Sequence, residues 1–65
     1  MTKPEFQNKA SEIIGQIRDG VRTLHPYRDP EDLENDAEIL VLLAGELSVL
    51  AGDMAEQKGE NHVNT

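Results

Sequence analysis

The first half of the chain has apolar and polar positions arranged with the period of an α-helix. Apolar residues recur at spacings of three and four, which places them on one face of a helix. Thr2 followed by Glu5 is typical of a capping box, and Pro4 is tolerated in a first helical turn. The pattern predicts a helix over about 3–24, with a core face made of Phe6, Ala10, Ile13, Ile17, Val21 and Leu24. Gly20 falls on or beside this face, where a neighbouring helix can approach closely; the alternative is that it only weakens the helix locally.

The second half keeps the helical period, with small and large apolar residues in alternation. This order holds the four-three spacing of a coiled-coil seam over three heptads. Alanine at every seventh position lets a second helix approach closely, which favours a tight antiparallel partner. The pattern predicts a helix over about 30–57, with a seam made of Leu33, Ala37, Leu40, Ala44, Leu47, Ala51 and Met54.

The middle of this second helix carries more apolar residues than one neighbour can cover. Its second apolar set consists of Ile39, Val41, Leu42, Leu43, Val49 and Leu50. Because such a helix is apolar over most of its circumference, we expect it to lie at the centre of a homo-oligomer. The expected oligomer interface consists of Leu33, Ala37, Leu40, Leu43, Ala44, Leu47, Leu50, Ala51 and Met54.

The two helical patterns are separated by a short turn over residues 25–29. Pro26 disfavours the helical conformation at His25, so the first helix is expected to stop there. Asp29 is placed to cap the second helix, with Pro30 at its first position and Asp32 at the reciprocal capping position. A turn this short normally joins antiparallel neighbours. The predicted fold is all-α, an antiparallel two-helix hairpin that assembles into a homo-oligomeric helical bundle.

We expect one domain over residues 1–58, ending in a C-terminal turn and cap at Lys58 and Gly59, and a flexible polar tail over 59–65. A chain of 65 residues buries little surface on its own, and with no cysteine it has no disulfide to stabilise it. This again favours oligomerisation. Without an export signal or an apolar run of membrane-spanning length, the sequence predicts a soluble, cytoplasmic protein without membrane contact.

Charge is distributed unevenly along the chain, whose formal net charge is −7. Residues 1–28 carry five basic and three acidic residues, a balance of +2, whereas residues 29–65 carry ten acidic residues and one lysine, a balance of −9. This asymmetry suggests that the halves attract one another or that each faces a different partner. The acidic total argues against nonspecific binding to nucleic acid.

The sequence offers few residues in the arrangements that catalytic sites need. Ser11 and Ser48 lie in helical patterns without a histidine at helical spacing, and there is no cysteine. The acidic residues between Asp29 and Glu38 lack the spacing of an EF-hand loop, and acids near a helix start complement the helix dipole. The sequence therefore predicts a non-catalytic protein without a metal or other cofactor.

A cluster of basic residues surrounds the turn and forms the candidate ligand site. Its predicted members are Arg18, Arg22, His25, Tyr27 and Arg28. An aromatic ring beside guanidinium groups suits a nucleobase next to its phosphate, and equally a carboxylate-bearing protein surface. In the alternative interpretation, Arg18 and Arg22 pair with acids of the second helix or of a neighbouring chain, and Tyr27 fills the corner.

Tyr27-Arg28-Asp29, between a short amphipathic helix and a long helix with Gly45 and Glu46, resembles a phage protein family. These are the small phage proteins that act as cyclic-oligonucleotide sponges against bacterial CBASS immunity. The resemblance implies a helical homo-oligomer that sequesters a signalling nucleotide between subunits without hydrolysing it. It implicates Tyr27 and Arg28 in ligand binding and Gly45 in packing.

A second hypothesis belongs to a different class of function. The apolar residues between Ile39 and Leu50 exceed what a lone hairpin needs. The chain would then be a small helical inhibitor or adaptor that binds a host protein through its apolar second helix or its acidic surface.

Overall fold

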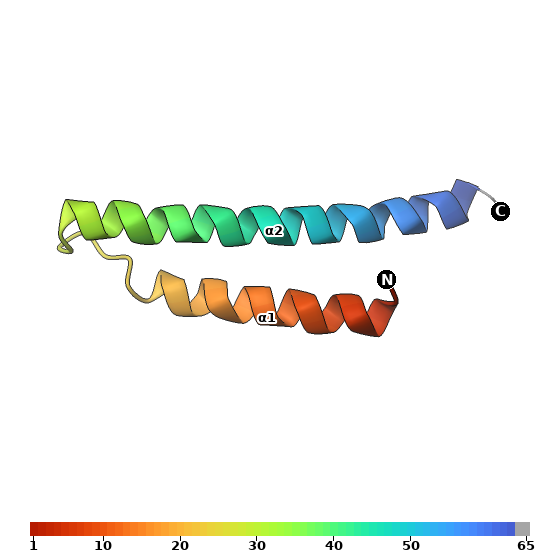
Figure 1. Ribbon diagram of the computed structural model, residues 1–65, viewed down its shortest axis with the longest axis horizontal. Helices are drawn as coiled ribbons and strands as arrows, with labels where there is room; N and C mark the ends of the chain where they lie inside the picture. Colours follow the sequence, from red (N-terminus) through yellow and green to blue (C-terminus); the bar gives the residue numbers. More distant parts are fainter. Residues whose placement is uncertain (64–65) are drawn as a thin grey trace.

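The computed structural model describes residues 1–63, with side chains described through Gln57. Helix α1 spans Lys3–Val21 and helix α2 spans Pro30–Val63, and these are the secondary-structure elements of the described residues. The two helices pack side by side in opposite directions, joined by residues 22–29 at one end (Figure 1). The molecule is elongated, with extents of 53 × 18 × 13 Å. The predicted all-helical hairpin is confirmed.

Helix α1 begins where the sequence predicts. Thr2 has an extended backbone, and its Oγ1 accepts a hydrogen bond of 3.3 Å from the Glu5 backbone N–H. The helix ends at Val21, earlier than the predicted Leu24. Beyond Val21 the chain forms tighter turns, in which the backbone N–H of Leu24 donates to the carbonyl of Val21 at 3.0 Å. Such tightening satisfies the last carbonyls of a helix before the chain leaves it.

Helix α2 also begins at its predicted cap. The Asp29 carboxylate accepts a hydrogen bond of 3.2 Å from the Glu31 backbone N–H, and Pro30 is the first helical residue. The helix then runs past Gln57 and through the predicted cap at Gly59 to Val63. One glycine costs a helix only about 1 kcal/mol, so it ends a helix only where other signals agree. Of the predicted tail, residues 64–65 lie outside the described residues.

The core is a single seam between α1 and α2. Helix α1 contributes the predicted face, except that Val21 is 52% exposed. The half-buried side chains of α2 are Leu33, Asp36, Ala37, Leu40, Leu43, Leu47, Leu50 and Met54. Ala44 and Ala51 of the predicted seam are exposed instead. Leu43 and Leu50, each next in the chain to one of these alanines, are half-buried in their place.

Helix α1 approaches α2 closely at Gly20. A Cβ atom added at Gly20 would lie 2.7 Å from Cδ2 of Leu40, closer than carbon atoms pack. Gly15 lies in the same helix, and an added Cβ there would meet nothing within 4 Å. The predicted role of Gly20 in close helix approach is confirmed, with Leu40 as the residue of α2 that packs against it.

Candidate functional site

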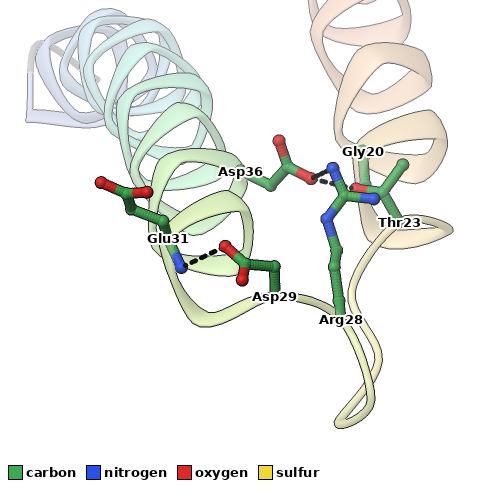
Figure 2. A network of polar contacts seen from close by, with 6 residues as sticks. All are labelled: Gly20, Thr23, Arg28, Asp29, Glu31 and Asp36. Atoms are coloured by element: carbon green, nitrogen blue, oxygen red, sulfur yellow. Dashed lines mark hydrogen bonds and ion pairs between the residues drawn. The ribbon is translucent and has the colours of Figure 1, made fainter.

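The connection between the helices is held by a polar cluster centred on Asp36. Nη2 of Arg28 lies 2.9 Å from Oδ2 of Asp36, and Oγ1 of Thr23 lies 2.8 Å from the same oxygen. Oγ1 of Thr23 is also 2.9 Å from the carbonyl oxygen of Gly20, so its single proton serves one of the two acceptors at a time. Figure 2 shows how Thr23 and Arg28 converge on Asp36 from the end of α1 and from the loop. We call these three residues the Asp36 clamp.

The clamp engages a residue that the sequence analysis assigned to ligand binding. The side chains of Arg28 and Asp36 are only 32% and 24% exposed, and Nε of Arg28 is buried without a hydrogen-bond partner among the described residues. Arg28 therefore packs into the turn and joins the loop to α2. A partly exposed pair of this kind stabilises a fold by about 1 kcal/mol or less.

Tyr27 has the opposite environment, at the tip of the turn. The Arg28 backbone N–H donates to the His25 carbonyl at 3.2 Å, which closes a β-turn with Pro26 and Tyr27 at its two central positions. The Tyr27 side chain is 93% exposed. The alternative in which Tyr27 fills the corner is wrong, since a tyrosine that fills a corner loses most of its exposure.

The other predicted ligand-binding residues surround this turn on its exposed side. Arg18 belongs to the last turn of α1, Arg22 is its C-terminal cap, and His25 begins the loop. All three are exposed, and within residues 1–57 the one ion pair formed by side chains is that of Arg28 with Asp36. The structure thus brings Arg28 into the clamp and leaves Arg18, Arg22, His25 and Tyr27 open to solvent.

A second candidate surface lies on the exposed side of α2. We call Leu42, Gly45, Val49 and Gly52 the outer face. Leu42 is 69% exposed and Val49 is 66% exposed, and their neighbours Val41 and Ile39 are 69% and 55% exposed. The excess of apolar residues predicted for this helix is therefore real. Among the described side chains, Ala10 alone is buried, at 8% exposure.

A groove between α1 and α2 borders the outer face. Its volume is about 570 Å³, and its lining residues are Lys9, Glu12, Ile13, Gly45, Glu46, Val49, Leu50 and Asp53. Its lining combines apolar residues with the charged residues Lys9, Glu12, Glu46 and Asp53. The sequence analysis missed Lys9 and Asp53, which lie far apart in the chain. The signal that brings them together is the antiparallel register set by the short turn.

The outer face is apolar but short. Neither helix, over its described length, is apolar for a stretch that could cross a membrane. Comparisons of the chain with protein-family models, with curated proteins and with solved structures found no match.

Proposed function

We propose that the protein is a non-catalytic helical interaction module that binds through the outer face of α2. The observation that carries this proposal is the exposure of Leu42 and Val49, two large apolar side chains of α2 that the hairpin leaves uncovered. Apolar surfaces of this kind on small soluble proteins mark interaction sites. The contact would be helix against helix, since the outer face has the four-three spacing of a coiled-coil seam.

The geometry of α2 supports a helical occupant over a globular one. Leu42, Gly45, Val49 and Gly52 follow one another at spacings of three and four along about three turns of α2, and an apolar groove lies beside them. Helices pack by inserting ridges of side chains into such grooves, with their axes about 8–10 Å apart. Homo-oligomeric assembly is the simplest form of this contact and belongs to the same proposal.

Sedimentation velocity tests the proposal with the double variant Leu42→Lys/Val49→Lys. Wild-type protein is measured alone over a wide concentration range, and then with an excess of a synthetic amphipathic helical peptide. We expect association in at least one of these two arms, and none in either arm for the double variant. Circular dichroism checks that the variant keeps its helices.

Val21→Lys is the matched control, because Val21 is also an exposed branched apolar residue but lies on α1. It should associate as the wild type does. A wild-type chain that stays monomeric in both arms contradicts the proposal. An equal loss of association in Val21→Lys and in the double variant also contradicts it.

We also propose a second candidate, the sequestration of an anionic nucleotide at the turn, in line with the sponge resemblance. The exposure of Tyr27 at 93%, in the same connection between the helices as the exposed Arg22 and His25, is the observation that favours it. An aromatic ring next to cationic groups is suited to stacking on a base while a phosphate is bound nearby. Because Arg28 is part of the Asp36 clamp, the candidate nucleotide-binding residues of one chain are Tyr27, Arg18, Arg22 and His25.

Calorimetric titration with a panel of cyclic di- and trinucleotides tests this second candidate. Tyr27→Ala and Arg22→Ala should each weaken binding by about tenfold or more, which corresponds to one lost stacking or charged contact. Arg28→Ala is a poor probe because it also opens the Asp36 clamp. Absence of binding by every nucleotide in the panel rejects the candidate, as does unchanged binding in the Tyr27 variant.

A further inference from the structure

The outer face alternates projecting side chains with open gaps. Leu42 and Val49 project into solvent, whereas a Cβ added at Gly45 or Gly52 would meet nothing within 4 Å. Along the helix the order is large, glycine, large, glycine, at spacings of three, four and three residues. A helix that docks here has to supply gaps opposite the two large residues and large residues opposite the two glycines.

We infer that a second copy of this chain supplies that complement, with its α2 antiparallel to the first. Seam positions of an antiparallel pair meet in layers about a two-fold axis, which here passes midway between Gly45 and Val49. Leu42 then lies opposite Gly52 of the second copy, and Val49 lies opposite Gly45 of the second copy. Each large side chain of one outer face enters a glycine gap of the other.

A parallel pair lacks this fit. Every residue then lies opposite its own copy, so that Leu42 meets Leu42 while Gly45 faces Gly45 across a void. Voids of this kind forfeit the dispersion contacts of the atoms that line them. The outer face is therefore complementary to itself in the antiparallel direction only.

The acidic residues of α2 favour the same direction only slightly, through the placement of Asp53. A parallel pair would align every acid with its own copy, including Glu38, Glu46, Asp53 and Glu56. The antiparallel pair moves Asp53 beside Ile39 of the second copy. It keeps Glu46 near its own copy at the axis and places Glu38 opposite Glu56 of the second copy. The groove beside Glu46 holds one cation, Lys9, together with the acids Glu12 and Asp53. Repulsion between like charges at short range is thus reduced but not abolished.

This inference rests on the proposed function, because it names the occupant of the same outer face. The first test uses Gly45→Ala and Gly52→Ala, with Gly15→Ala as the matched control. All three added methyl groups have open space within the chain, so each variant should keep the hairpin. Only the first two fill a gap that the second copy needs.

Sedimentation equilibrium should show dimers of the wild type, and the two outer-face variants should raise the dimer dissociation constant about tenfold or more. Gly15→Ala should leave it unchanged. A dissociation constant unaffected by Gly45→Ala and Gly52→Ala overturns the inference. A wild type that binds an amphipathic peptide but never itself also overturns it, while leaving the proposed function intact.

The second test determines whether the two α2 helices of the dimer run antiparallel or parallel. The chain has no cysteine, so one introduced cysteine reports one position. Ser48 lies beside the expected axis, and Ser48→Cys should form a disulfide-linked dimer under mild oxidation. Glu56→Cys should not cross-link with itself but should cross-link with Glu38→Cys when the two variants are mixed. Efficient self-cross-linking of Glu56→Cys would demonstrate a parallel pair and overturn the inference.

Discussion

The two sides of α2 differ in what they meet, although both are rich in apolar residues. On the α1-facing side Leu40 packs against Gly20, and the polar residue of that side, Asp36, is bound by Thr23 and Arg28. On the outer face Leu42 and Val49 remain about two-thirds exposed. One helix thus carries two apolar surfaces, and the hairpin covers only the first. If the protein associates as proposed, folding and association use separate residues and should be separable by mutation.

The largest contrast is expected between Leu40→Ala and Leu42→Ala. Leu40→Ala should lower the free energy of unfolding by about 2 kcal/mol, because it removes the side-chain atoms that pack against α1 and leaves a cavity. Leu42→Ala should change it by less than about 0.5 kcal/mol when the protein is dilute enough to be monomeric. Urea denaturation followed by circular dichroism measures both. Equal destabilisation by the two variants would show that the sides of α2 do not differ.

The glycines offer the next largest contrast. Gly20→Val places a branched side chain against Leu40 and should cost about 1–2 kcal/mol by overpacking. Gly15→Val, in the same helix with open space around it, should be neutral or slightly stabilising, because valine has a somewhat higher helix propensity than glycine. Thermal unfolding of the two variants decides the matter. A Gly20→Val protein as stable as Gly15→Val would mean that the helices do not approach closely there.

A smaller effect is expected from opening the Asp36 clamp. Asp36→Ala should destabilise the hairpin by about 1 kcal/mol, since it removes one partly exposed ion pair and one hydrogen bond. Glu38→Ala, an exposed acid in the same helix, serves as the control and should have almost no effect. The difference between the two should shrink in high salt, where ion pairs are screened. If it persists unchanged, the ion pair is not the source of the stability.

The smallest effect on folding is expected at Tyr27. Tyr27→Ala should leave the free energy of unfolding within about 0.5 kcal/mol of the wild type, because the side chain makes little contact with the rest of the chain. Chemical denaturation tests this directly. A clear loss of stability would place Tyr27 in the structural turn and remove the reason to regard it as a binding residue.

The sequence predicts those parts of the fold that depend on local chemistry. The cap at Thr2, the helix start at Asp29-Pro30 and the antiparallel turn all follow from backbone preferences of single residues, and the structure confirms them. The end of α2 was predicted less well, because the helix continues through Gly59. A glycine without a following proline or a change of periodicity is a weak stop signal.

The parts that depend on packing could not be predicted in the same way. Leu40 belongs to two stripes at once, one continuing through Ala44 and one through Leu43, and helical spacing does not choose between them. In the structure Leu43 is half-buried and Ala44 is exposed. The pairing of Arg28 with Asp36 joins residues on different elements, so it depends on the path of the loop rather than on helical spacing.

The most direct test of the outer face is a dilution series followed by amide NMR. Association through this surface predicts concentration-dependent shifts at Leu42, Gly45, Val49 and Gly52, with much smaller shifts at Leu40 and Leu47 on the other side of α2. Shifts confined to the α1-facing side, or spectra that do not change over the whole dilution series, would contradict the account.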